Sequence, residues 1–218
     1  MTVHSDGGTR SGGSVSGVKA RNDKRKQILA AATRVFARKG FYHSKVSEIA
    51  AQAGVADGTI YLYFKNKDDL LVQLFEDTMD RILSGVRTAL DGCTEIRQKI
   101  HLFIAHHLQL VQSDRDLAEI ITVELRQSHK FMKEYANPKF GEYLQIFANI
   151  VQEGQDLGVI KAEINARVVS RALFGALNEL FLYWLMGRGK FTLDEAIRNI
   201  DEILLGGLFV EHTSPCHR

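Results

Sequence analysis

The chain has 218 residues, 28 basic and 26 acidic side chains, and a formal net charge of +2. Its 45% hydrophobic content allows one sizeable core plus a small appended domain, and its two prolines favour an all-α protein. Cys93 and Cys216 are the two cysteines, which excludes a disulfide framework and fits a reducing cytoplasm.

The N-terminal segment and the most apolar stretch of the sequence carry no sign of secretion or membrane insertion. Residues 1–20 are predicted to be a disordered tail, because the segment through Gly17 is rich in Gly, Ser and Thr and lacks the apolar run of a signal peptide. The stretch 172–186 contains Asn178 and Glu179 and is too short to cross a bilayer. We therefore expect a cytoplasmic protein that does not bind a membrane.

The first predicted helix covers residues 22–39. Gly40 is expected to end it, since glycine readily adopts the left-handed conformation that terminates helices. Apolar side chains at helical spacing predict its buried face, and these are Ile28, Ala32, Val35 and Phe36.

Residues 44–67 have the pattern of a helix-turn-helix. Ser44 is the predicted N-cap of a short helix, and Gly54 permits the sharp turn after it. The buried face of this helix is predicted to comprise Val46, Ile49, Ala50 and Ala53. In the second short helix, Ile60 and Phe64 point towards the core, which leaves Gly58, Thr59 and Leu62 for the major groove of DNA.

Charge is distributed unevenly along the chain. Residues 19–67 carry eleven Lys or Arg against three acids, whereas residues 68–218 carry sixteen bases against twenty-two acids. A basic domain attracts phosphate, and an acidic remainder keeps the rest of the protein away from the duplex. The alternative is a solvated basic helix face without a nucleic-acid partner.

The pattern GxxxGxIYxYFxxKxxL also resembles the TetR family of transcriptional regulators. It begins at Gly54 and continues through Gly58, Tyr61 and Tyr63 to Leu70, and the similarity extends over residues 24–71. The resemblance implies an N-terminal three-helix helix-turn-helix DNA-binding domain at 21–67. It further implies a larger helical ligand-binding and dimerisation domain at 68–212, followed by a flexible C-terminus at 213–218. Ala56 departs from the family, which usually has Ser or Thr as the cap there; Asp57 is the nearest replacement.

The resemblance also implies a set of DNA contacts. Those expected to reach phosphates are Ser44, Lys45, Tyr61, Tyr63 and Lys67. Gly58 would allow close backbone approach, Thr59 would contact a base, and Leu62 would offer an apolar contact. Lys19 and Arg21 could add contacts from the tail. For the two tyrosines, packing within the small domain is the alternative.

Beyond the DNA-binding domain, helical patterns continue to residue 211. Asn66 is a good N-cap for a helix over 66–90, with Asp69 completing a capping box. Because this helix joins both domains, its tilt would move the DNA-binding domain. Further helices are predicted at 94–112, 115–125, 128–154 with an irregularity near Pro138, 165–186, and 193–211 with a capping box of Thr192 and Glu195.

Two of these helices carry faces that could pair with a second copy of the chain. One has small residues at Ala172, Gly175 and Ala176. The other has an apolar stripe of Ile197, Ile200, Leu204 and Leu208. The family resemblance implies a homodimer built as an intermolecular four-helix bundle, which suits a palindromic operator in double-stranded DNA. The alternative is that both faces belong to the core of one chain.

A narrower resemblance concerns the small-molecule effector. Residues 55–71, the sequence ELRQS at 124–128, and Phe174, Gly175, Glu179 and Trp184 look like the acyl-CoA-responsive fatty-acid-degradation repressors of the TetR family. This implies a repressor of fatty-acid degradation genes that long-chain acyl-CoA releases from DNA. The candidate ligand-binding residues are Phe103, His107, Glu124, Arg126, Lys130, Tyr143, Phe147, Asn178, Phe181 and Trp184.

The same resemblance suggests residues for the CoA phosphates, and it leaves alternatives open. The CoA phosphates would be met by Arg126, Lys130, Lys133 or Arg171. However, aromatic side chains at helical spacing are commonly core, and Glu124 with Arg126 could form a structural ion pair. A drug or xenobiotic is the alternative effector.

Other functional classes find little support. The sequence lacks a Gly-rich phosphate loop, a GxSxG elbow and a CxxC pair, so we do not expect an enzyme. His101, His106 and His107 do not have the i, i+4 spacing of paired ligands, and neither a metal nor a cofactor is expected. A membrane-surface module would need exposed Leu or Trp opposite its basic residues, whereas the apolar face of 22–39 is required for a core.

Overall fold

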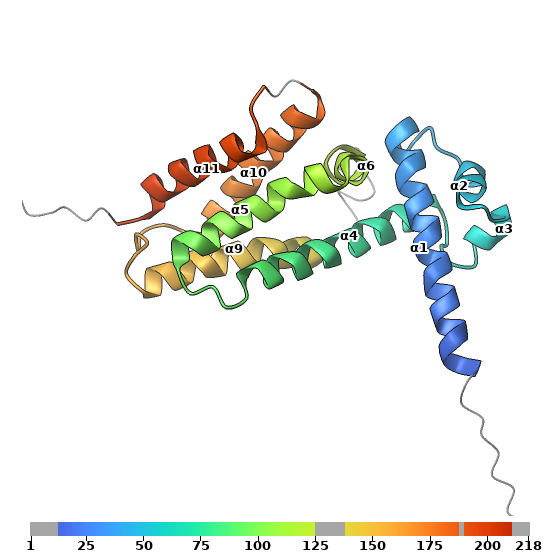
Figure 1. The fold of residues 1–218 in the computed structure, drawn as a ribbon, viewed down its shortest axis with the longest axis horizontal. Helices are drawn as coiled ribbons and strands as arrows, with labels where there is room; N and C mark the ends of the chain where they lie inside the picture. Colours follow the sequence, from blue (N-terminus) through green and yellow to red (C-terminus); the bar gives the residue numbers. More distant parts are fainter. Residues whose placement is uncertain (1–12, 125–137, 188–189, 211–218) are drawn as a thin grey trace, which may run out of the picture. The chain divides into compact units, whose positions relative to one another are not determined.

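The computed structural model describes residues 13–124, 138–187 and 190–210, and the chain divides into two compact units, Met1–Leu71 and Val72–Arg218 (Figure 1). The regular elements within these ranges are helices, which confirms the predicted all-α class. Ile160 and Phe209 form an isolated antiparallel bridge. Residues 1–12 of the predicted tail and the whole predicted flexible C-terminus at 213–218 lie outside the described residues.

The first unit contains three helices, α1 (Gly13–Lys39), α2 (Val46–Ala53) and α3 (Asp57–Ile60). Helix α1 ends where predicted, with Gly40 at φ 74°. It begins earlier than predicted, so the disordered tail is wrong for residues 13–20. The residues after Gly17 include Ala, Lys and Arg, which favour helix. Once a helix has nucleated, each further residue adds a hydrogen bond, so the helix extends towards the N-terminus.

The core of the first unit forms between α1 and the two short helices. The buried face predicted for α1 is confirmed, since all four of its residues are at most 1% exposed. Ile49, Ile60 and Phe64 are buried from the other side. Gln27 Nε2 on α1 also donates to the carbonyl oxygen of Ala53 at 2.8 Å, which fixes the end of α2.

Helix α4 (Lys67–Leu90) begins in the first unit and continues into the second. The predicted cap is confirmed, because Asn66 Oδ1 accepts from the amide of Asp69 at 2.8 Å. In the second unit, a Cβ at Gly85 would lie 2.4 Å from Cε1 of His106 on the next helix. A side chain at position 85 would therefore have to displace the His106 ring.

The second unit is a helical bundle. Its further elements are α5 (Ile96–Ser113), α6 (Arg115–Glu119), the π-helical turn η1 (Ile120–Glu124), α9 (Pro138–Asp156), α10 (Ala166–Leu185) and α11 (Leu193–Leu208). Helix α5 contacts α9, α10 and α11 (Figure 1). The predicted helix 115–125 is thus half α and half π, and only the part of the predicted helix 128–154 from Pro138 onward lies in the described residues.

The N-terminal caps of the last two helices behave as their side chains predict. Asn165 accepts from the amides of Arg167 and Val168, and Thr192 forms the capping box with Glu195. Hydroxyl and carbonyl oxygens at these positions satisfy amides that have no partner within the helix.

The two faces proposed for self-association differ in exposure. Ala172, Gly175 and Ala176 on α10 are exposed, beside Val168 at 63%. On α11, Ile197 and Leu208 are buried within this chain, so the predicted stripe is wrong at these two positions. They belong to the core because α11 packs on α5, and Ile203 is instead the exposed apolar residue of α11, at 68%.

Helix α10 has one further property. Of the described helices it alone is long and apolar enough to cross a membrane, and 28% of its apolar window is buried. Length and composition alone fit a helix that packs against other protein equally well.

Candidate DNA-binding surface and effector site

The turn between α2 and α3 has the geometry of a helix-turn-helix. Gly54 adopts φ 63° and ψ 38°, and its amide donates to the carbonyl oxygens of Ala50 and Ala51. Such a left-handed residue ends α2 at little cost because glycine has no Cβ. Helix α3 follows after two residues, and backbone hydrogen bonds continue its turn to Phe64.

The caps of these two short helices differ from the prediction. Lys45, not Ser44, occupies the N-cap position of α2, and Glu48 Oε2 accepts from the Lys45 amide at 3.1 Å. Lys39 on α1 pairs with the same carboxylate, which lowers the pKa of Glu48. At α3, Ala56 makes no side-chain cap, and Asp57 lies inside the first turn. Asp57 therefore does not supply the N-cap that was predicted in place of a Ser or Thr at position 56.

Ser44 has a structural contact instead of the predicted phosphate contact. Its side chain is buried, and Oγ donates to the carbonyl oxygen of Gly40 at 2.6 Å. The hydroxyl therefore closes the loop after α1 and faces away from solvent.

Lys67 is also used inside the first unit. Its Nζ donates to the carbonyl oxygens of Phe41 at 2.7 Å, Ser44 at 3.1 Å and Tyr42 at 3.3 Å, and lies 4.5 Å from the centroid of the Phe41 ring. An ammonium group has three N–H donors, so all three are engaged. The phosphate contact predicted for Lys67 would require these bonds to break.

The remaining predicted DNA contacts are accessible. Lys45 is exposed, Tyr61 is 56% exposed and Leu62 is 72% exposed, while Thr59 and Tyr63 are partly exposed. A Cβ at Gly58 would meet nothing within 4 Å. The Arg21 guanidinium lies 5.9 Å from the centroid of the Tyr63 ring, so this tyrosine has a partner on α1. Lys19 and Arg21 are exposed along α1.

In the second unit, the predicted effector residues that the structure describes gather between α5, α9 and α10. The Phe103 ring lies 4.9 Å from that of Tyr143 and 5.0 Å from that of Phe147. His107 Nδ1 and Tyr143 Oη form a hydrogen bond of 2.6 Å. The imidazole ring is also 6.0 Å from Phe174 and 6.1 Å from Phe181, both on α10.

Burial keeps both polar members of this cluster neutral. Loss of solvation, with a smaller effect of His106, lowers the pKa of His107 to about 4. Loss of solvation also raises the pKa of the Tyr143 hydroxyl. The pair therefore holds one imidazole proton and one phenol proton at physiological pH, and acts through hydrogen bonds and not through charge.

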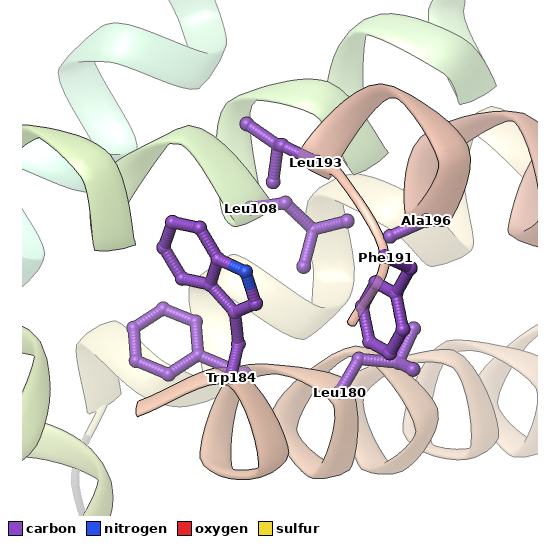
Figure 2. A pocket seen from close by; sticks show the side chains of 7 residues that line it. Leu108, Leu180, Trp184, Phe191, Leu193 and Ala196 are labelled. Carbon is purple, nitrogen blue, oxygen red and sulfur yellow. The ribbon is translucent and has the colours of Figure 1, made fainter. Parts of the chain in front are cut away.

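A small apolar pocket lies next to this cluster (Figure 2). Its volume is about 240 Å³, including open solvent. The enclosed part of this space is about 10 Å³, room for roughly one water molecule. The lining residues are Leu108, Leu180, Phe181, Trp184, Phe191, Leu193 and Ala196.

The sequence prediction found only part of this site. Phe181 and Trp184 line the pocket, while Phe103, His107, Tyr143 and Phe147 form the neighbouring cluster. The side chain of Glu124, which ends η1, is not described, and Arg126 and Lys130 lie outside the described residues. Phe174 was missed as a site residue, although it shares a helix face with the predicted Asn178 and Phe181.

The family is evident from comparison with known proteins. Residues 28–74 match the family described as "Bacterial regulatory proteins, tetR family", and residues 75–207 match "YsiA-like protein, C-terminal region". The chain belongs to the TetR family. It is 36% identical over 191 residues to the fatty acid metabolism regulator protein of Bacillus subtilis (strain 168), covering 88% of this chain and 98% of that protein.

Two solved structures of regulators are also similar to this chain. The FadR transcriptional regulator of Bacillus subtilis, solved in complex with stearoyl-CoA, has 37% identity and a TM-score of 0.78, covering 84% of this chain and 98% of that one. The fatty acid degradation regulator FadR of Bacillus halodurans has 34% identity and a TM-score of 0.79, covering 89% and 97%.

Replacing Lys67 should destabilise the first unit. Lys67→Met keeps the aliphatic stem but leaves three carbonyl oxygens without their charged donor, so we expect the free energy of unfolding to fall by about 2 kcal/mol. Urea denaturation of the full chain measures it. Lys65→Met removes an exposed ammonium two residues away and should change stability by less than about 0.5 kcal/mol. Equal effects of the two replacements would contradict the structural role of Lys67.

Stability should also depend on pH through His107. Its pKa is lower in the folded chain, about 4, than the ordinary value of 6.5, so below pH 6.5 the unfolded chain binds a proton that the folded chain does not. The free energy of unfolding therefore falls as pH decreases, by at most about 2 kcal/mol between pH 7 and pH 5.

Urea denaturation of wild type and His107→Gln across this pH range tests the contribution. The variant should have a flatter profile, and any slope that remains belongs in part to His106, whose pKa burial also lowers. Identical slopes would show that His107 does not titrate in this way.

Proposed function

We propose that this TetR-family regulator is a homodimeric repressor that a long-chain acyl-CoA releases from a palindromic operator, and that it controls fatty-acid degradation genes in the cytoplasm. The observation that carries the effector assignment is the aromatic cluster between α5, α9 and α10, with its apolar pocket, in a chain similar over most of its length to a regulator solved with stearoyl-CoA. A drug or xenobiotic is the other effector class that such an apolar interior would accept.

Operator binding would use the exposed part of the helix-turn-helix. Lys45 supplies a phosphate contact, while Thr59, Tyr61 and Leu62 are available at the groove and Gly58 allows close approach. Lys19 and Arg21 extend the basic surface along α1. Lys67 and Ser44 take no direct part here, because their polar groups hold the loop between α1 and α2.

Dimerisation would bury the exposed face of α10. Val168 at 63% exposure, the small residues Ala172, Gly175 and Ala176, and Tyr183 at 42% share this face. Ile203 on α11 adds an apolar side chain. Small residues allow two helices to approach closely, and a two-fold axis would present two DNA-binding units to two half-sites.

Transmission would pass from α9 to α4. Lys139 on α9 donates to Asp80 Oδ2 at 2.6 Å, and Arg87 pairs with Glu142. Helix α9 also carries Tyr143 and Phe147 of the aromatic cluster. A ligand that displaces these rings would therefore shift α4, whose first residue, Lys67, holds the loop before α2. Hundredfold relief of repression requires the ligand to prefer the off-DNA conformation by about 2.7 kcal/mol.

The effector is tested by two optical signals. Fluorescence anisotropy of a labelled DNA fragment from upstream of the protein's own coding region reports release, and emission from Trp184, the only tryptophan, reports binding next to the pocket. Stearoyl-CoA should change both signals, while stearate and CoA alone should not. If stearoyl-CoA changes neither signal, the acyl-CoA assignment fails and another apolar effector must be sought.

DNA binding is tested at Gly58. A methyl group at this position meets nothing within the chain, so Gly58→Ala should fold normally and gain up to about 1 kcal/mol from helix propensity. At the DNA interface the same methyl would hold the backbone away, and we expect affinity for the fragment to fall at least about tenfold.

Gly141→Ala is the matched control. Gly141 lies on α9, where an added Cβ also meets nothing within 4 Å, and its replacement should leave DNA affinity unchanged. Full affinity in Gly58→Ala would exclude close backbone approach at this position.

A further inference from the structure

Asn178 is a buried polar residue without a visible structural task. It is 8% exposed, on an apolar face of α10, and makes no hydrogen bond with a described residue. Within the described residues, Asp201 Oδ1 is the one fully enclosed side-chain polar atom that lacks a partner. The amide atoms of Asn178 must therefore touch space that a small polar group can reach.

The position of Asn178 directs this amide towards the aromatic cluster. Phe174 and Phe181 lie one turn before and one turn after it on the same face of α10. His107 contacts both rings, at 6.0 and 6.1 Å between centroids. From this helical spacing we infer that the amide of Asn178 and the imidazole of His107 border the same region between α5 and α10.

The His107–Tyr143 pair also has a donor to spare. A neutral imidazole carries one N–H and a phenol carries one O–H, so the pair has two donors for the one hydrogen bond that joins them. If Tyr143 donates, the N–H at His107 Nε2 is left over; if His107 donates, the hydroxyl of Tyr143 is left over. Neither residue makes another hydrogen bond within the described part of the chain.

We propose that Asn178 and the His107–Tyr143 pair bind an oxygen atom of the effector, and so select an acyl group that carries a carbonyl or hydroxyl oxygen over a purely hydrocarbon chain. This rests on the acyl-CoA effector proposed above. The oxygen is the thioester carbonyl or an oxygen farther along the chain. Both accept a hydrogen bond, and in an aromatic enclosure a donor left without an acceptor is costly, which creates the selectivity.

Three CoA compounds of equal chain length separate the possibilities. They are stearoyl-CoA, 3-hydroxystearoyl-CoA, and the thioether S-octadecyl-CoA, which lacks the carbonyl. Their dissociation constants are measured by Trp184 emission in the full chain, for wild type, Asn178→Leu and Tyr143→Phe. In wild type the thioether should bind about tenfold more weakly than stearoyl-CoA, as one lost buried hydrogen bond implies.

The variants test whether the amide and the phenol meet that oxygen. In Asn178→Leu the difference between thioester and thioether should largely disappear, and in Tyr143→Phe it should shrink, because an imidazole N–H remains but is no longer held in place. If the hydroxyl along the chain is the group bound, stearoyl-CoA and the thioether bind alike, 3-hydroxystearoyl-CoA binds tighter, and Asn178→Leu removes that advantage.

Stability separates a binding role from a structural one. Leucine has nearly the shape of asparagine and needs no hydrogen bond, so Asn178→Leu should melt at the same temperature as wild type or higher. A lower melting temperature, together with an equal loss of affinity for all three compounds, would overturn the proposal. So would equal affinities of wild type for the three. Failure of every CoA compound to bind would instead overturn the proposed effector and this inference together.

Discussion

The three hydrogen bonds of the Lys67 ammonium hold the DNA-binding unit in its shape. They join the first residue of α4 to the carbonyl oxygens of the loop that leads from α1 into α2. Ser44 closes the same loop from within, through its bond to Gly40. Helices α2 and α3 have eight and four residues, and helices of this length are far too short to persist alone in water. Their position depends on this loop and on the apolar contacts behind it.

The same arrangement explains how a helix displacement could reach the DNA surface. In the proposed transmission, a shift along α4 would pull on the carbonyl oxygens that precede α2, because Lys67 is the first residue of α4. Farther along, α4 is paired with α9 through Asp80 and Lys139. At both sites one partner is a charged ammonium, and such hydrogen bonds are stronger than neutral ones.

The sequence predicted those features that depend on local patterns. Helix caps at Asn66, Asn165 and Thr192, and the turn at Gly54, follow from side chains acting on their own backbone within a few residues. The roles of Lys67 and Ser44 were missed because their partners lie on the other side of a fold. The sequence alone does not distinguish a lysine whose ammonium binds a phosphate from one whose ammonium binds a carbonyl oxygen 25 residues earlier.

In the effector site, too, the sequence predicted features within one helix but not the contacts between helices. Apolar spacing on α5, α9 and α10 identified Phe103, Phe147 and Phe181, because core and pocket residues share one helical period. That period does not reveal which helices meet, so the bond between His107 and Tyr143 and the place of Phe174 in the cluster were out of reach. The stripe on α11 failed for a related reason: Ile197 and Leu208 pack on α5, and an apolar stripe does not specify whether its partner is the same chain or another.

The tight packing of the aromatic cluster constrains how an effector can act. Ring centroids lie 4.9 and 5.0 Å apart around Phe103, and the neighbouring pocket of about 240 Å³ includes open solvent, so a long acyl chain can enter the space between these described side chains only if they move. Protein interiors are as dense as organic crystals, so such rings change place in discrete steps and carry their helices with them. In the proposed transmission, the cost of opening the cluster is part of the signal: a ligand that fills the opened space would stabilise a displaced α9, whereas one that fits without opening it would leave α4 where it was.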